Sequence, residues 1–350
     1  MRLSAEADRE LTGGSPGISS AEKELDRLSG RVLAATGGDR EPRRVVSALN
    51  RVLFEEERFA YDPVAGNPDN FLLNRVLARK RGNCLGLTGV YLCLAERMGI
   101  PLRAVYVPSH CFVRYEDAAA RINIEPGDRG GERSDERYAR EFGVGRNRPY
   151  LGTLGEAEFL GVFLKSLGAA YSRRGMEEKA LETYRRAAEA YPGLPDAYYN
   201  AGVSYQKLGR LDEAIVQYRR ALALDPEMAP AHDNLGVALA GMGRYKEALD
   251  EARKAVGLAP RNALSRGNLA ATLCACGDIE GGIREYRKVL ALDPRNARAL
   301  EGLAKAYFSR GMYREASSYC GRAMDAGCRF DAAMLGALEP YRAPPESTGP

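Results

Sequence analysis

The sequence contains no tryptophan and only two histidines, His110 and His232. Zinc and copper sites commonly use several imidazole ligands, so a multi-histidine metal centre is excluded. We expect neither a metal nor another cofactor. Any chemistry that needs an imidazole has at most two candidates.

Long apolar runs are also lacking: no window approaches the ~18 consecutive apolar residues of a membrane span. The first residues, MRLSAEADRELTGG, lack the apolar core of a signal peptide, which predicts a cytoplasmic protein. The 51 basic and 47 acidic residues nearly balance, so no nucleic-acid partner is expected. Neither a P-loop nor a strand followed by GxGxxG is present, and a nucleotide site is not predicted.

The seven cysteines form no CxxC pair, and their odd number argues against a disulfide framework. The nearest pair, Cys274 and Cys276, would point about 200° apart on a helix and could not share a metal ion. We expect most of these thiols to be small buried apolar groups. Cys84 is the exception.

The second half of the chain is an internal repeat. Four prolines stand 34 residues apart, at Pro192, Pro226, Pro260 and Pro294. Glycines and small residues keep the same register, and five copies fit without a gap, at 161–194, 195–228, 229–262, 263–296 and 297–330. Each copy has an amphipathic helix, a turn with glycine, a second amphipathic helix and a proline stop. This pattern resembles the tetratricopeptide repeat (TPR).

That resemblance implies an all-α solenoid over 161–342, with 331–342 as a closing helix and 343–350 as a disordered tail. It also implies a protein or peptide partner on the concave face. The period assigns a set of side chains to that face: Lys165, Tyr199, Asn200, Lys207, Asn234, Asn268 and Lys305. His232 occupies a position in the third copy where a bulky side chain packs between helices, and we expect no chemical role for it.

In the first half, residues 1–40 are predicted to be a polar segment with a helix, 41–150 an α+β domain and 151–160 a linker. Residues 41–61 are expected to form one helix, and another begins near Cys84 and ends at Gly99. Residues 103–115 are rich in β-branched and aromatic side chains and predict a strand with an irregularity at Pro108. A second short strand is predicted at 121–126.

A candidate catalytic group follows from this arrangement. Cys84 would lie in the first turn of a helix, where free N–H groups and the helix dipole favour a thiolate. His110 would lie on the next strand, with Asn123 and Glu125 brought back beside it on one face. Cysteine, histidine and then a carboxylate or amide is an arrangement for nucleophilic acyl transfer. The spacing does not decide between Glu125 and Asn123, and it identifies no oxyanion donor beyond the Cys84 N–H.

The segments LNRVLFEEERFAYDP, NRVLARKRGNCLGLTGVYLCLAERMGIPL and PSHCFVRY resemble bacterial SirB-type transglutaminase-like proteins of the papain superfamily. The resemblance covers about residues 41–130 and implies a transglutaminase-like fold, with repeats of the tetratricopeptide type commonly following it. It aligns Glu125 with the third catalytic position. Two functions are consistent with it: a thiol-dependent amide hydrolase or acyltransferase, or a non-catalytic adaptor in which both domains bind proteins.

Overall fold

The computed structural model describes residues 7, 11, 17–64, 67–144 and 150–342. Its contacts divide the chain into two compact units, Met1–Ser204 and Tyr205–Pro350. Each unit has apolar core residues of its own. Within the described ranges, no helix is long and apolar enough to cross a membrane.

The N-terminal unit is built on an antiparallel sheet with the strand order β6-β5-β4-β3-β7. Its strands are β3 (Leu102–Val107), β4 (His110–Glu116), β5 (Arg121–Glu125), β6 (Gly131–Glu132) and β7 (Thr153–Leu154). The single strand predicted over 103–115 is wrong, because the chain reverses between β3 and β4 at Pro108 and Ser109. Ser109 takes a left-handed conformation with φ of 62°, and Val107 pairs with His110 across the turn. The turn thereby places His110 at the first position of β4.

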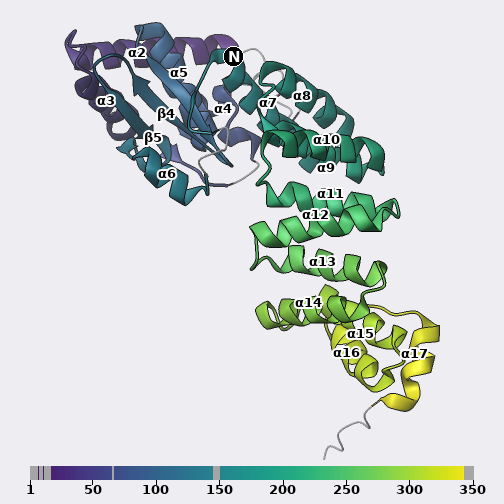
Figure 1. Ribbon diagram of the computed structural model, residues 1–350. Coiled ribbons are helices and arrows are strands. Elements are labelled where there is room, and N and C mark those ends of the chain that lie inside the picture. The colour runs from purple at the N-terminus through teal and green to yellow at the C-terminus, as the bar shows by residue number, and fades with distance from the viewer. Residues whose placement is uncertain (1–6, 8–10, 12–16, 65–66, 145–149, 343–350) are drawn as a thin grey trace, which may run out of the picture. The chain divides into compact units, whose positions relative to one another are not determined.

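Helices cover this sheet on the side of the main core. They are α2 (Ile18–Thr36), α3 (Pro42–Asn50), α4 (Leu73–Arg79) and α5 (Cys84–Met98). Helix α5 packs against β3 and β4, and α2 packs against α5 (Figure 1). Leu25, Leu28 and Val32 of α2 are fully buried in the same core as Tyr91 of α5. Residues 18–36 are therefore part of this domain and not the separate segment predicted for 1–40, because their apolar side chains recur at helical spacing.

The predicted helix over 41–61 ends early. A π-helical turn (Arg51–Glu56) follows α3, and Arg58 then adopts a left-handed φ of 59° that stops the helix. The chain continues as β1 (Ala60–Tyr61), which pairs in parallel with β2 (Arg81–Gly82). Tyr61 consequently lies beside the residues that lead into α5.

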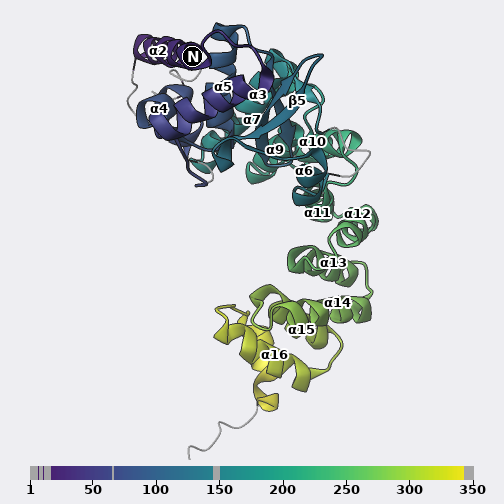
Figure 2. The ribbon, with the colours of Figure 1, turned by 90° about the vertical axis from the view of Figure 1, so that its left-hand side faces the viewer.

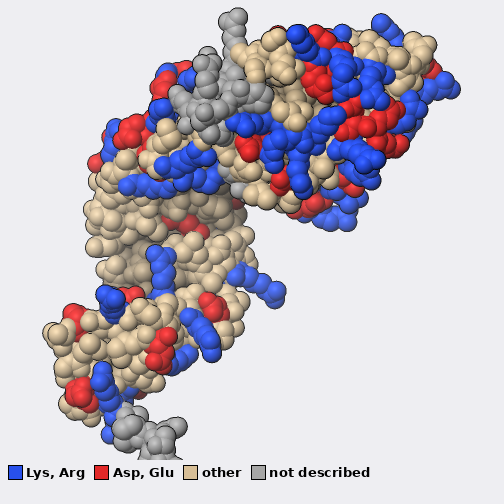
Figure 3. Space-filling model, turned by 180° about the vertical axis from the view of Figure 1, so that it is seen from behind, with Lys and Arg blue, Asp and Glu red and all other residues tan. Residues whose placement is uncertain are grey.

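The buried carboxylate of Glu57 holds this region to its neighbours. It pairs with Arg27 and Arg31 of α2 and with Lys80 at the end of α4. Hydrogen bonds from Arg27 and Lys80 outweigh burial and lower the pKa of Glu57 to about 2. Figure 3 shows basic and acidic side chains interleaved over one face of the N-terminal unit, in keeping with the balanced charge of the sequence.

The linker predicted at 151–160 is instead structured. Leu154 of β7 pairs with Ala104 of β3, and α7 (Glu156–Arg173) begins directly after Gly155. Helices α8 (Glu177–Ala190) and α9 (Pro195–Lys207) follow. Apolar side chains of α7 share a core with Leu85 and Tyr106. The first predicted repeat is thus packed on the sheet.

The C-terminal unit consists of helices that stack in consecutive pairs (Figure 2). They are α10 (Leu211–Leu224), α11 (Ala229–Gly241), α12 (Tyr245–Leu258), α13 (Ala263–Ala275), α14 (Ile279–Leu292), α15 (Ala297–Ser309), α16 (Tyr313–Asp325) and α17 (Ala332–Leu338). The turns within the pairs use Gly243, Gly277 and Gly311 at φ of 74°, 91° and 71°, where a side chain would be strained. Met334 and Leu338 of α17 complete the last core. The predicted tail, 343–350, lies outside the described residues.

Candidate active site

Cys84 is the first residue of α5 and is partly exposed. The cap residue Asn83 fixes this end of the helix: its side chain accepts a hydrogen bond from the Gly86 N–H at 3.0 Å. Its own N–H donates to the carbonyl oxygen of the buried Asn70 at 2.8 Å. The N–H groups of the first turn have no acceptor within the helix, so those beside Cys84 are suited to hold an anion.

Two glycines let the start of α5 approach the chain before α4. A Cβ on Gly86 would lie 2.3 Å from the Asn70 carbonyl oxygen and 2.8 Å from Val76 Cγ2. A Cβ on Gly82 would lie 3.0 Å from the same oxygen. The position of the Cys84 thiol is therefore set by backbone packing that only glycine permits.

The structure brings Cys84, His110 and Glu125 together. The Cys84 side chain is hydrogen-bonded to that of His110. His110 Nε2 lies 2.7 Å from Glu125 Oε2, and the two side chains are only 11% and 3% exposed. Thiol, imidazole and carboxylate thus form one hydrogen-bonded chain from the start of α5 to the end of β5.

The protonation of His110 is shifted by this chain. Burial alone would lower its pKa, but hydrogen bonds with Cys84 and Glu125, and the charges of both, raise it to about 9. For Glu125 burial acts in the opposite direction, yet the hydrogen bond and charge of His110 leave its pKa below the usual value. At neutral pH this geometry favours an imidazolium next to a carboxylate.

Further groups hold Glu125 and His110 in place. The Tyr138 hydroxyl of α6 (Asp135–Glu141) donates to Glu125 Oε2 at 2.9 Å, and the Gly127 N–H donates to Oε1 at 2.8 Å. The Phe142 ring stacks on His110 with ring centres 4.8 Å apart and planes 6° from parallel. Sequence reasoning missed Tyr138 and Phe142. The only signal was their spacing of four residues, which puts two aromatic rings on one side of a helix.

Asn123, the alternative partner for His110, does not reach it. The strand register sets Asn123 opposite Arg114, four residues along β4 from His110. Its side-chain oxygen accepts from Arg114 Nε at 2.7 Å, and its amide donates to Asp135 Oδ1 at 2.7 Å. Asn123 and Glu125 share a face, but at about 3.4 Å per residue only Glu125 is near enough to His110.

The predicted concave-face residues fall in both units. In the N-terminal unit, Lys165 Nζ lies 5.1 Å from the centre of the Tyr106 ring of β3, so Lys165 faces the sheet domain. Tyr199 and Asn200 are half-buried on α9. Lys165 is therefore not displayed as the repeat period implied, because the first repeat packs on the sheet.

In the C-terminal unit, Lys207 is exposed and Asn234 is half-buried. The Asn268 amide donates to Asp233 Oδ1 at 3.4 Å, and Lys305 Nζ lies 2.5 Å from Glu301 Oε1. Asn268 is thus already bonded within the repeat array.

His232 is buried in α11. Its Nδ1 lies 2.5 Å from Glu251 Oε2 and its Nε2 lies 3.0 Å from the Pro226 carbonyl oxygen. Both ring nitrogens therefore have partners, and His232 packs within the repeat as expected. Among the described residues, no three His, Cys, Asp or Glu side chains are grouped so as to hold a metal ion.

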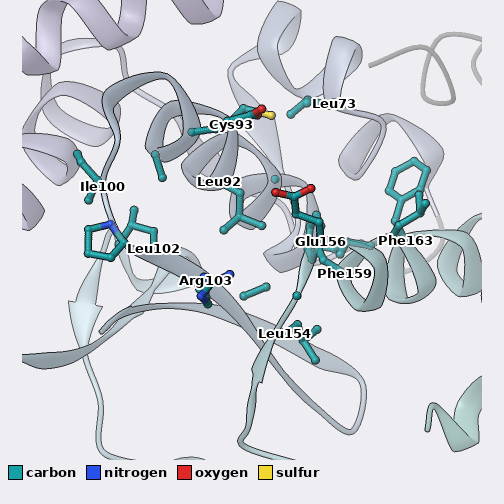
Figure 4. Close-up of a pocket in the computed structure, with 18 of the residues that line it drawn as sticks. Leu73, Leu92, Cys93, Ile100, Leu102, Arg103, Leu154, Glu156, Phe159 and Phe163 are labelled. Carbon is teal, nitrogen blue, oxygen red and sulfur yellow. The ribbon is translucent and has the colours of Figure 1, made fainter. Parts of the chain in front are cut away.

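An apolar cavity of about 470 Å³ lies between α5, β3, β7 and α7. Figure 4 shows Leu92 and Cys93 of α5 on one side of it and Phe159 and Phe163 of α7 on another. Arg103 is among the few charged residues that line it. Its walls belong to both the sheet domain and the first repeat, which again shows that the two are one body.

Comparison with known families agrees with this architecture. Residues 19–147 match the family model of the Transglutaminase-like superfamily. The chain carries a transglutaminase-like domain. Repeat families follow it: Tetratricopeptide repeat models match 166–193, 195–228 and 229–262, and a TPR repeat model matches 270–311. The predicted fold class, α+β followed by an all-α repeat array, is confirmed.

Curated relatives match parts of the chain. A UPF0162 protein of Xylella fastidiosa is 29% identical over 179 residues, which cover 45% of this chain and 59% of the relative. The chain thus spans less than two thirds of that relative's length. The human F-box only protein 21 is 29% identical over 83 residues, covering 23% of this chain and 13% of the relative.

Solved structures resemble about half of the chain. A MamA crystal structure aligns with a TM-score of 0.43 at 24% identity, covering 46% of this chain and 94% of MamA. YrrB, described as a TPR protein with an unusual peptide-binding site, aligns with a TM-score of 0.45 at 23% identity, covering 51% and 92%. Pseudomonas aeruginosa pilF aligns with a TM-score of 0.47 at 24% identity, covering 52% and 82%. These distant likenesses carry no argument about function.

Proposed function

We propose that the transglutaminase-like domain is a thiol-dependent amide hydrolase or acyltransferase with Cys84 as its nucleophile. The observation that carries this proposal is the hydrogen-bonded chain from the Cys84 thiol through His110 to the buried Glu125. A nucleophile, a base and a group that orients the base are the components that acyl transfer needs.

The chemical steps follow from the positions of these groups. The Cys84 thiolate attacks the amide carbon, a C–S bond forms, and the carbonyl electron pair moves to oxygen. When the pair returns, the C–N bond breaks and the amine leaves with a proton from the His110 imidazolium. Neutral His110 then takes a proton from water or an acceptor amine, whose attack on the thioester releases the acyl group and restores the thiolate and the imidazolium.

Glu125 acts as a positioning residue in this scheme. Its carboxylate bonds His110 Nε2 and is itself held by Tyr138 and Gly127, so it fixes both the ring orientation and the positive charge. With the pKa of His110 near 9, the imidazolium is the main form at pH 7 and carries the proton that the leaving amine needs.

The repeat array supports a role in protein interaction, since tetratricopeptide arrays typically bind proteins or peptides. We assign it the recruitment of the protein whose amide Cys84 attacks. The exposed Lys207 of the predicted set is the first side chain to test for that contact. The seven cysteines are all unpaired thiols, which supports a reducing, cytoplasmic location.

Alkylation with iodoacetamide tests the catalytic proposal. We expect Cys84 to react at pH 7 faster than the exposed Cys276, with both rates measured on the same sample by peptide mass spectrometry. In His110→Ala, Cys84 should slow to the rate of Cys276, whose own rate stays constant. If Cys84 reacts no faster than Cys276 and His110→Ala changes nothing, the domain is an adaptor and not an enzyme.

A further inference from the structure

Tyr61 stands beside the start of α5 although it precedes Cys84 by 23 positions in sequence. In the parallel pairing of β1 and β2, Tyr61 lies opposite Gly82, two residues before Cys84. Hydrogen bonds of 2.9 Å on either side, from Ala60 N–H to the Lys80 oxygen and from Asp62 N–H to the Gly82 oxygen, fix this register. The backbone of Tyr61 is thus tied to the segment that carries the nucleophile.

The Tyr61 side chain extends toward the other end of the catalytic chain. Its ring lies against Gly127, since a Cβ on that glycine would be 3.4 Å from Tyr61 Cδ2 and Cε2. Gly127 is the residue whose N–H holds the Glu125 carboxylate. Tyr61 therefore lies between β2, which leads into Cys84, and the turn after β5 that holds the Glu125 carboxylate.

The Tyr61 hydroxyl is available as a donor within the described part of the chain. The residue is 38% exposed, and no described side chain or backbone group is hydrogen-bonded to its hydroxyl. Burial, followed by the negative charges of Cys84 and Glu125, raises the pKa of this hydroxyl, so the phenol keeps its proton at neutral pH. It cannot act as a base there, but it can donate a hydrogen bond.

Attack on a carbonyl places negative charge on the carbonyl oxygen, and that charge needs donors that do not move during the reaction. The Cys84 N–H in the first turn of α5 supplies one. We infer that the Tyr61 hydroxyl supplies the second, donating to the oxyanion of the tetrahedral intermediate formed at Cys84. This inference rests on the proposed function and makes Tyr61 a catalytic residue of it.

Two reactions of the Cys84 thiol distinguish a donor to the oxyanion from a group that stabilises the thiolate. Iodoacetamide reacts at an sp³ carbon: the C–S bond forms, iodide is displaced and no oxyanion appears. With p-nitrophenyl acetate, Cys84 attacks the ester carbon, an oxyanion forms, and its collapse yields acetyl-Cys84 and p-nitrophenolate. A residue that stabilises the thiolate affects both reactions, whereas an oxyanion donor affects only the second.

We expect Tyr61→Phe to slow acetylation of Cys84 by about 10²-fold, the usual effect of losing one oxyanion donor. Its rate of alkylation by iodoacetamide should stay within twofold of wild type. The burst of p-nitrophenolate, corrected with Cys84→Ala, measures the first reaction, and peptide mass spectrometry at Cys84 measures the second. Tyr245→Phe is the matched control, since Tyr245 is 42% exposed and lies on α12. It should change neither rate.

Tyr61→Phe with both rates unchanged would overturn the inference, and so would an equal loss of both, which would make Tyr61 a support of the thiolate. In either case the proposed function would stand, since wild-type Cys84 would still be acylated. A wild-type Cys84 that alkylates no faster than Cys276 would instead refute the proposed function, and the role of Tyr61 with it.

Discussion

At the scale of single residues, the site depends on a histidine that is both buried and charged. Burial opposes the imidazolium, so the charge exists only because Cys84 and Glu125 are hydrogen-bonded to the ring. Cys84 was predictable because it begins a helix, and His110 because the chain has only two histidines. Residue spacing could not choose between Asn123 and Glu125, which share a strand face, since that choice depends on strand register; only the family resemblance favoured Glu125.

Glu125→Gln should lower the pKa of His110 from about 9 toward its ordinary value of 6.5, because the neutral amide removes a charge and an anionic hydrogen-bond acceptor. NMR titration of the two histidine C2 protons measures this shift, with His110→Ala assigning the signals. A His110 that titrates near 6.5 in the wild type would contradict the predicted charge.

The shifted pKa values of His110 and Glu125 also make the free energy of unfolding depend on pH. Since the pKa of His110 is higher in the folded state, its contribution to the free energy of unfolding is full below pH 6.5 and lost as pH rises through about 9. Glu125 has a lowered pKa, so its contribution is present above pH 4.5 and lost as pH falls below that value. Urea unfolding at pH 6 and pH 9 should therefore show a larger loss in wild type than in Glu125→Gln.

At the scale of elements, helix α5 carries the nucleophile and its first turn is the most constrained part. Its two ends were predictable from Cys84 and Gly99. The break between β3 and β4 was not, because a proline inside an apolar run is compatible with both a bulge and a turn. The sequence predicts a helix that ends near Tyr61, because the residues before it have helical periodicity. The left-handed conformation of Arg58, which ends the helix and directs Tyr61 into β1, has no signal in the sequence.

Gly86→Ala should destabilise the N-terminal unit by about 1–3 kcal/mol, since its Cβ would overlap the Asn70 carbonyl. It should also reduce the alkylation rate of Cys84 by displacing the first turn. Gly89→Ala, one turn later, is the control: its Cβ meets only Leu73 Cδ1 at 3.7 Å, and alanine in a helix stabilises by up to about 1 kcal/mol. Urea unfolding of both variants measures the difference. Equal stabilities would show that α5 can shift away from Asn70.

At the scale of the whole molecule, the boundary between the sheet domain and the repeats differs from the one that the repeat period predicts. A period of 34 residues identifies every repeat, but it does not show that the first repeat packs against the sheet domain. The sequence therefore predicted a linker at 151–160, whereas β7 joins the sheet there and α7 covers Phe71 and Leu85. The first compact unit runs to Ser204.

A chain stopped after Tyr150 should lose cooperative unfolding, because it lacks β7 and exposes the apolar side chains that α7 covers. A chain stopped after Gly209 keeps α7, α8 and α9 and should unfold cooperatively in urea. Circular dichroism of the two fragments checks this. A shorter fragment as stable as the longer one would mean that the first repeat contributes nothing to the stability of the sheet domain.

The attachment of α7 to the sheet also limits how such a protein can change over evolutionary time. Helix α7 has 18 residues, against 13 or 14 in α10 to α16, and the match to the repeat family begins only at residue 166. Its extra length and its buried side chains serve the domain before it. Loss or duplication of the first helix pair, α7 and α8, would disturb the domain that carries the thiol site. Repeats after this pair can be gained or lost without that effect, so we expect the number of repeats to vary at the C-terminal end of the array.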